Sequence, residues 1–144
     1  MKPTNQTMHH FIDPLSYETK IAYADTDAGG VVYHANYIEM AERARLDALA
    51  QIGYPIKKML DDDKGCFVVK KLNITYHHTA KLEDTITILT QPIDIKKTSI
   101  TFCQEFCLKE KSLAILEILL VFISINQWKP IKIPDALSAL FIKP

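Results

Sequence analysis

The sequence has no excess of charge of either sign. Its 17 lysine and arginine residues balance 17 aspartate and glutamate residues, so the formal net charge is zero. Proteins that hold nucleic acid or an anionic membrane surface usually carry a basic patch or stripe. The balanced charge therefore argues against nucleic-acid and membrane-surface partners.

Cysteine is scarce, and the cysteines that are present form no recognisable set. Cys66, Cys103 and Cys107 cannot all pair within one chain, and their spacings match no zinc or haem pattern. Such usage fits a reducing compartment. We therefore expect a cytoplasmic protein with no metal site.

Long hydrophobic runs are also absent. The longest, Leu113–Ile125, contains Glu117 and Ser124 and is too short to cross a bilayer as a helix. Residues 1–13 are polar and lack the apolar stretch of a secretory signal. The sequence predicts neither an integral membrane segment nor a secretory signal.

The remaining composition is typical of a globular domain, with 48% apolar and 24% charged residues. A chain of 144 residues is close to the usual size of one domain, and no internal repeat divides it. We therefore expect a single domain over residues 1–144. Residues 1–14 show no periodicity and are interpreted as a loose N-terminal leader that either docks on the domain or stays disordered.

One segment has clear helical periodicity. It begins at Asn36, which we interpret as the N-cap because Glu39 follows three residues later. Gly53 and Pro55 supply a stop signal. The apolar residues at helical spacing are rich in alanine and comprise Tyr37, Met40, Ala41, Ala44, Ala48 and Ile52. Small residues on this stripe allow the helix to lie close to the surface on which it packs.

The other segments favour strands, because β-branched and aromatic residues dominate them. The predicted strands are Leu15–Ala24, Cys66–His77, Thr85–Ile95, Ser99–Lys109 and Leu113–Ile125. Pro92 predicts a bulge or an edge position. The fourth strand alternates between apolar and polar residues, which predicts one solvent-facing side. The last is apolar on both faces, which predicts a central strand covered by the helix and by another element, such as a partner subunit.

The order of strand, helix and four strands indicates an α+β fold. One long central helix is expected to be wrapped by a curved antiparallel five-stranded sheet. The pattern leaves the strand order open.

Residues with chemical potential gather between Tyr23 and Arg45, where the sequence reads YADTDAGGVVYHANYIEMAERAR. Gly29 and Gly30 permit a tight turn whose amides can approach a ligand. The helix that follows presents unsatisfied N–H groups, which suit a developing oxyanion. A nearby carboxylate can serve as a nucleophile or as a general base on water, and Asp25 and Asp27 are the candidates.

Structural roles for the same residues stay open on the pattern alone. Asp25 equally suits the capping of local amides, and His34 equally suits a packed loop. A calcium loop is rejected, because Gly29 and Asn36 occupy the positions where such a loop needs ligands. His77 and His78 alternate in direction on a strand, so we interpret the pair as structural or as the edge of a substrate site.

The run YADTDAGGVVYHANY, followed by AERAR, resembles the 4-hydroxybenzoyl-CoA thioesterase family, and within it most closely the Tol-Pal-associated YbgC branch. The resemblance implies the hotdog fold and hydrolysis of acyl-CoA thioesters to free acid and CoA. It implies no cofactor and no metal.

By position, the resemblance assigns the catalytic roles to Asp27 and His34. Asp27 attacks the thioester carbonyl or activates water, His34 orients the thioester or water, and backbone amides around His34 to Tyr37 polarise the carbonyl. Asp25 and Glu42 are supporting residues. The expected substrate-binding residues are Gly29, Gly30, Val31, Asn36 and Tyr37.

The same resemblance implies a homodimer or homotetramer with the site where two chains meet. Lys70, Lys71 and Lys81 are candidates for binding the CoA nucleotide. Two other functions fit the fold: a hotdog dehydratase acting on hydroxyacyl thioesters, and a non-catalytic module that binds acyl-CoA or interacts in the Tol-Pal system. The acyl preference stays open.

Overall fold

The computed structural model of the chain describes residues 10–144. Its strands are β1 (Leu15–Lys20), β2 (Gly65–Tyr76), β3 (Thr85–Ile95), β4 (Ser99–Leu108) and β5 (Lys111–Ser124). Its helices are α2 (Asn36–Gln51), α3 (Ile56–Lys58) and α4 (Asp135–Leu140), with a 3₁₀ turn at Tyr23–Asp25 and a π-helical turn at Met59–Asp63. None of the helices within residues 10–144 is long and apolar enough to cross a membrane.

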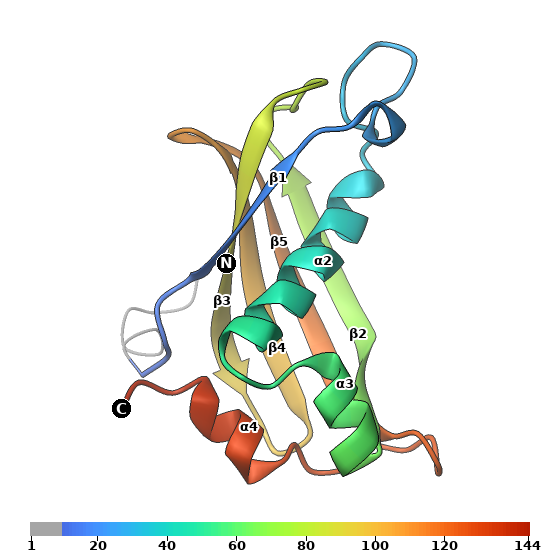
Figure 1. Cartoon of the computed structure of the whole chain (residues 1–144), viewed down its shortest axis with the longest axis vertical. Coiled ribbons are helices and arrows are strands. Elements are labelled where there is room, and N and C mark those ends of the chain that lie inside the picture. The colour runs from blue at the N-terminus through green and yellow to red at the C-terminus, as the bar shows by residue number, and fades with distance from the viewer. Residues whose placement is uncertain (1–9) are drawn as a thin grey trace.

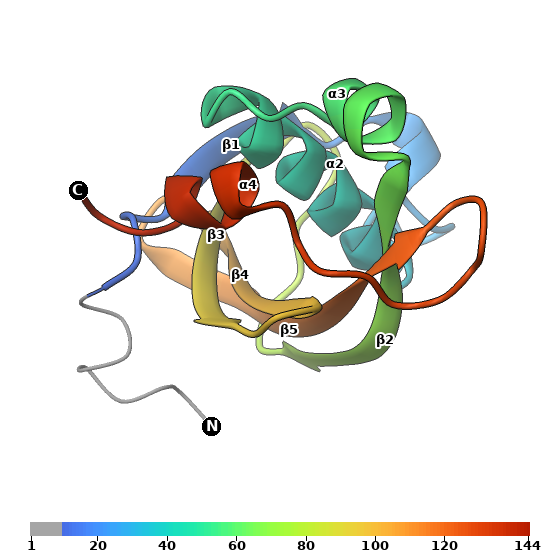
Figure 2. The ribbon, with the colours of Figure 1, turned by 90° about the horizontal axis from the view of Figure 1, so that it is seen from below.

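The five strands form one antiparallel sheet in the order β1-β3-β4-β5-β2 (Figure 1). The sheet curves around α2, which lies against its concave face (Figure 2). This arrangement confirms the predicted α+β hotdog fold with one long central helix. The predicted irregularity at Pro92 is also confirmed, because the register between β3 and β4 shifts between Pro92 and Asp94.

The helix α2 packs through the predicted alanine-rich stripe. Ala41, Ala44 and Ala48 are at most 4% exposed. Gly53 follows the helix with a φ of +85°, in the left-handed conformation typical of a helix C-terminus. The prediction that Asn36 is the N-cap is wrong, because Ala35 occupies that position and Asn36 is the first helical residue. The Asn36 Nδ2 instead donates to the carbonyl oxygen of Asp25 at 2.8 Å, so a tertiary partner has replaced the helix amides.

The inner face of β4 contains Ile100, Phe102 and Phe106, all of them buried, in agreement with the predicted alternation. The outer face is less exposed than the alternation predicted, because Thr101 and Glu105 are half-buried rather than open to solvent. β5 lies between β4 and β2, which confirms the central position expected for it. Its Glu117 is half-buried on the outer face, opposite Asn73 of β2 and Cys103 of β4.

A buried polar chain crosses the interface between the sheet and α2. Gln104 of β4 is fully buried, and its Nε2 donates to the carbonyl of Ala41 at 2.9 Å and to Oγ1 of Thr90 at 3.0 Å. Its Oε1 accepts a hydrogen bond from Nη1 of Arg45 at 2.8 Å. Burial lowers the pKa of Arg45, and the nearby Glu42 carboxylate partly opposes this effect. The chain thus satisfies every side-chain hydrogen-bonding group of Gln104 within the core.

Part of the expected leader is packed against the domain. Residues 1–9 lie outside the described residues. Phe11 is buried, and the amide of Ile12 donates to the carbonyl of Phe141 at 3.0 Å. Nε2 of Gln91 donates to the carbonyl of Ile12 at 2.8 Å. From residue 11 onward the N-terminal segment therefore docks beside the C-terminal helix α4.

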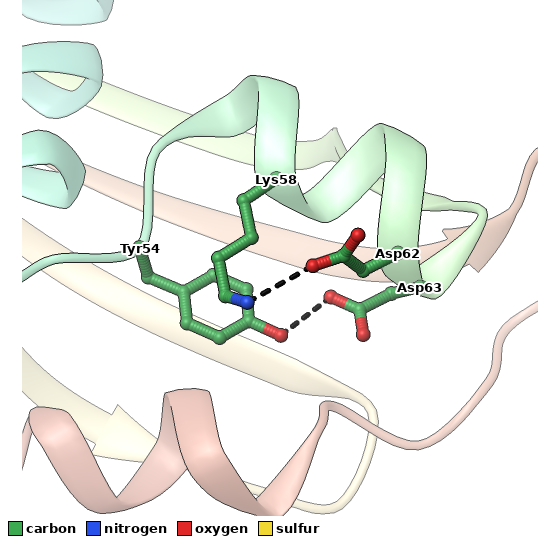
Figure 3. Close-up of polar contacts among 4 residues, drawn as sticks. All are labelled: Tyr54, Lys58, Asp62 and Asp63. Atoms are coloured by element: carbon green, nitrogen blue, oxygen red, sulfur yellow. Dashed lines mark hydrogen bonds and ion pairs between the residues drawn. The ribbon is translucent and has the colours of Figure 1, made fainter.

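The segment Ile56–Asp63 is helical, although no element was predicted between the stop signal at Gly53 and the strand that begins at Cys66. Tyr54, which is 4% exposed, donates its hydroxyl to Oδ2 of Asp63 at 2.5 Å (Figure 3). Nζ of Lys58 lies 3.0 Å from Oδ2 of Asp62 and 5.2 Å from the centre of the Tyr54 ring. These contacts fix the short helical segment to the end of α2.

Replacement of Tyr54 by phenylalanine should make unfolding less dependent on alkaline pH. Burial and the hydrogen bond to Asp63 raise the pKa of Tyr54 to about 12, above the value of about 10 for an unfolded chain. The neutral phenol therefore stabilises the folded state fully below pH ~10, and this contribution is lost as the pH rises through ~12. At neutral pH we expect the free energy of unfolding of Tyr54→Phe to be ~1–2 kcal/mol lower than that of the native protein.

Urea unfolding of the native protein and of Tyr54→Phe, from neutral pH to pH ~12, measures the difference in their free energies of unfolding. Both proteins contain the same lysines, so the effect of lysine titration cancels in this difference. A stability difference that stays constant between neutral pH and pH ~12 would contradict the assignment.

Candidate active site

The motif segment forms a compact turn between β1 and α2. The amide of Asp27 donates to the carbonyl of Val31 at 2.9 Å, and the amide of Gly30 donates to the carbonyl of Asp27 at 3.1 Å. Thr26 and Val32 form a bridge that closes the turn. Gly30 has a φ of +78°, a conformation that other residues adopt only at a cost. The paired glycines therefore form the tight turn that the sequence predicted.

Asp27 presents its carboxylate at the surface of this turn. Its side chain is exposed, and its Oδ1 accepts a hydrogen bond from the amide of Gly29 at 2.8 Å. A Cβ at position 29 would lie 3.3 Å from Oδ1 of Asp27, closer than most side-chain contacts. Within residues 10–144 no hydrogen bond is found to its other oxygen, which leaves that oxygen accessible to a substrate or to water.

Asp25 is half-buried, whereas Asp27 is exposed. Its Oδ2 accepts a hydrogen bond from the amide of Ala22 at 2.8 Å, which closes the 3₁₀ turn. Its carbonyl accepts bonds from the amide of Tyr33 at 3.0 Å and from Asn36 Nδ2 at 2.8 Å. Asp25 therefore ties both sides of the turn to the beginning of α2.

The residues before α2 form a 3₁₀-like turn that uses several amides of the helix N-terminus. The amides of Asn36, Tyr37 and Ile38 donate to the carbonyls three residues earlier, at 2.9, 3.4 and 3.2 Å. In the part of the chain that the structure describes, the amides of His34 and Ala35 have no acceptor. Of the amides from His34 to Tyr37 that the resemblance assigned to carbonyl polarisation, those of His34 and Ala35 are left available among the described residues.

His34 lies at the edge of a cavity of about 330 Å³ between the start of α2 and the end of β2. Its ring centre is 4.6 Å from that of Tyr33 and 6.3 Å from that of Tyr76. The hydroxyl of Tyr76 donates to the carbonyl of His34 at 2.8 Å. Burial raises the pKa of Tyr76, so this hydroxyl stays protonated as a donor at neutral pH.

The side chains of two expected substrate-binding residues have partners inside the protein. Tyr37 is 2% exposed, and its hydroxyl accepts a hydrogen bond from the amide of Ala80 at 3.0 Å. The Asn36 side chain binds Asp25, as described above. Val31 is half-buried and pairs with Lys81, so this lysine lies beside the turn that carries Asp27.

Three other candidates lie on α2 and β2, outside the turn that carries Asp27. Glu42 is exposed on α2 and lines a second cavity, of about 390 Å³, toward the other end of the helix. Lys70 and Lys71 are exposed on β2. No group of three or more histidine, cysteine or acidic residues within residues 10–144 is arranged to hold a metal ion.

The prediction that His77 and His78 point to opposite faces is wrong, because β2 ends at Tyr76. The amides of both histidines donate to the carbonyl of Leu113, at 2.8 and 3.0 Å, and both side chains line the cavity beside His34. Sequence reasoning also missed Tyr76 as a site residue. An aromatic residue next to a histidine pair at the end of a strand was the available signal.

Comparison with known proteins assigns the chain to a family. Residues 21–141 match the thioesterase-like superfamily. The chain belongs to this superfamily. It is 33% identical over 127 residues to "Acyl-CoA thioesterase YbgC" of Haemophilus influenzae, which covers 88% of this chain and 93% of the relative. It is 34% identical over 126 residues to "Acyl-CoA thioester hydrolase YbgC" of Escherichia coli O6:H1, and this match covers 87% of this chain and 93% of the relative.

Solved thioesterase structures share the fold. A probable thioesterase from Bartonella henselae superposes with a TM-score of 0.80 at 26% identity, over 84% of this chain and 99% of that one. The two YbgC relatives confirm the resemblance to the YbgC branch. This member of the thioesterase-like superfamily is a thioester hydrolase.

Alanine at Gly30 should lower thioester hydrolysis by this superfamily member, whereas alanine at Gly53 should not. Gly30 and Gly53 have φ values of +78° and +85°, and an added Cβ would meet nothing within 4 Å at either position. Both substitutions should therefore cost ~1–2 kcal/mol of unfolding free energy through backbone strain. Only Gly30→Ala disturbs the turn that carries Asp27.

Thermal unfolding and initial rates of thioester hydrolysis for the two variants measure these effects. Equal activities in Gly30→Ala and Gly53→Ala, at equal stability, would show that the turn does not position the reacting group.

Proposed function

We propose that the chain hydrolyses acyl-CoA thioesters to free acid and CoA, with Asp27 as nucleophile or general base. The observation that carries this proposal is the Asp27 carboxylate, exposed on a glycine turn with one oxygen bound by the Gly29 amide. That bond fixes the direction of the carboxylate without shielding its second oxygen. The names of the two YbgC relatives supply the substrate class.

The proposed reaction begins with attack on the thioester carbonyl, either by Asp27 or by a water molecule that Asp27 deprotonates. The carbonyl oxygen becomes an oxyanion, and the amides of His34 and Ala35 are the donors we assign to it. Collapse of this intermediate breaks the carbon–sulfur bond and releases CoA thiolate, which takes up a proton. In the nucleophilic route, water then hydrolyses the acyl-aspartate anhydride.

We assign His34 to the orientation of the thioester or of water. Its ring is close to those of Tyr33 and Tyr76, and its carbonyl accepts a hydrogen bond from the Tyr76 hydroxyl. The backbone of Gly29, Gly30 and Val31 is expected to contact the substrate, whereas Asn36 and Tyr37 shape the site through their internal hydrogen bonds. Lys81 is the lysine best placed to meet the CoA nucleotide, because it pairs with Val31.

A homo-oligomer with paired β2 strands is part of the proposal. β2 spans 12 residues and, within residues 10–144, is bonded to β5 along one side only, so its other edge is open in this part of the chain. Val69 on this strand is 56% exposed, and Leu46 on the adjacent helix is 52% exposed. An open edge flanked by apolar side chains suits association with a second copy. We further propose that the protein is located in the cytoplasm and hydrolyses acyl-CoA there.

Substitution of Asp27 by asparagine should remove turnover and retain binding. The amide keeps the size of the carboxylate and can still accept a bond from Gly29, but it cannot act as nucleophile or base. We expect kcat to fall by ~10²–10⁴-fold. Asp25→Asn is the matched control, because its amide oxygen can still accept the bond from Ala22, and it should lose far less activity.

Release of CoA thiol from a panel of acyl-CoAs gives the rates, and calorimetric titration with a non-hydrolysable acyl-CoA analogue gives the affinity. A native protein that binds the analogue but releases no thiol would favour the non-catalytic binding module. Hydration or dehydration of enoyl- and hydroxyacyl-CoA without thiol release would favour the dehydratase.

A further inference from the structure

The carbonyl of His34 is held mainly by a side chain from the sheet. Within residues 10–144 it accepts a hydrogen bond from the Tyr76 hydroxyl at 2.8 Å and one from the amide of Tyr37 at 3.4 Å. Amide-to-carbonyl bonds are usually ~2.9 Å long, so the bond from the helix is weak. Tyr76, which follows His34 by 42 positions, therefore sets the direction of this carbonyl.

The direction of this carbonyl also sets the direction of the next amide. The C=O of His34 and the N–H of Ala35 belong to one planar peptide group, and no peptide bond within residues 10–144 is cis. In a trans peptide the two groups point in opposite directions. The hydroxyl that draws the His34 carbonyl toward Tyr76 therefore turns the Ala35 amide away from Tyr76.

The amide of Ala35 is one of the two donors assigned above to the oxyanion. Ala35 has a φ of −67° and a ψ of −23°, which are helical values, so its N–H points out of the N-terminal end of α2 with the first helical amides. Among the described residues it has no acceptor. Its direction therefore depends on the other side of the same peptide, where Tyr76 donates.

We propose that Tyr76 is a positioning residue for the hydrolysis: by binding the carbonyl of His34, it holds the amide of Ala35 toward the developing oxyanion. This inference rests on the thioester hydrolysis proposed above, because that reaction forms the oxyanion. A hydrogen bond to a peptide carbonyl also polarises the peptide, which makes its N–H a stronger donor. Tyr76 thus acts through the peptide group and not by contact with the reacting atoms.

Tyr76 itself has a well-defined position. It is the last residue of β2 and pairs with Ala114 of β5. Its ring meets that of Tyr37 edge-on, with centres 5.5 Å apart, and the Tyr37 ring meets that of Phe106 in the same way at 5.3 Å. The sheet and the buried Tyr37 together direct the phenol of Tyr76 toward the residues before α2.

The variant Tyr76→Phe removes the hydroxyl and keeps the ring. The side chain is 41% exposed, so we expect the variant to fold. With the acyl-CoA that the native protein hydrolyses fastest, kcat should fall about tenfold, the effect of one hydrogen bond, and KM should stay unchanged. Release of CoA thiol measures both constants.

Two unreactive analogues separate the positioning of the amide from a contact with bound substrate. An S-alkyl thioether of CoA lacks the carbonyl, and in calorimetric titration Tyr76→Phe should bind it as tightly as the native protein does. A trifluoromethyl ketone analogue of acyl-CoA is hydrated at its carbonyl and resembles the tetrahedral intermediate. The variant should bind this ketone about tenfold more weakly.

Tyr54→Phe is the matched control. It also removes a tyrosine hydroxyl that donates a hydrogen bond, to Asp63, but Tyr54 follows the C-terminal end of α2. The 16 residues of this helix span ~24 Å between that end and the catalytic turn. In thermal unfolding Tyr54→Phe should lose stability, whereas its kcat should equal that of the native protein.

Each outcome decides the assignment. A kcat of Tyr76→Phe equal to the native value, or a fall that Tyr54→Phe reproduces, overturns it and leaves the hydrolysis intact. A raised KM with weaker binding of the thioether also overturns it, because Tyr76 then contacts the bound substrate. A native protein that releases no thiol from any acyl-CoA overturns the proposed hydrolysis and the role of Tyr76 with it.

Discussion

The close packing of α2 against the concave face of the sheet is the constraint on which the other features depend. Ala41, Ala44 and Ala48 meet the sheet with almost no exposed surface, and larger side chains there would push the helix outward. The position of the helix on the sheet determines where its N-terminal end lies. Because Tyr37 binds Ala80 and Asn36 binds Asp25, the glycine turn with Asp27 is held at that end. Fold and site therefore share one set of contacts.

Periodic features of the sequence predicted most of the fold, and local features predicted less. The alanine stripe of α2 and the apolar alternation of β4 extend over many residues, so tertiary contacts reinforce them. The N-cap depended on one residue, and Asn36 found a better partner in the carbonyl of Asp25. The short segment Ile56–Asp63 has too few turns to show a helical period. Its order comes from Tyr54, a residue outside it.

The site shows the same division. The acidic and glycine residues of the turn were recognised because they stand together in the sequence, and the structure gives Asp25 and Asp27 different surroundings. Tyr76, His77 and His78 were not recognised as neighbours of His34, because they come from the far end of β2 and meet it only after the sheet has formed. Arg45 and Gln104 likewise join across 59 positions in the chain. No local pattern predicts such pairs.

The buried chain from Thr90 through Gln104 to Ala41 and Arg45 restricts how α2 can slide on the sheet. Apolar contacts between α2 and the sheet tolerate a shift of the helix by one turn, because one apolar side chain then takes the place of another. Gln104 does not, because a shifted helix would leave its amide in the core without an acceptor and Arg45 without a partner, at a cost of several kilocalories per mole. The buried hydrogen bonds thus specify one alignment of the helix on the sheet. They disfavour misaligned dockings during folding, each of which would displace the turn that carries Asp27.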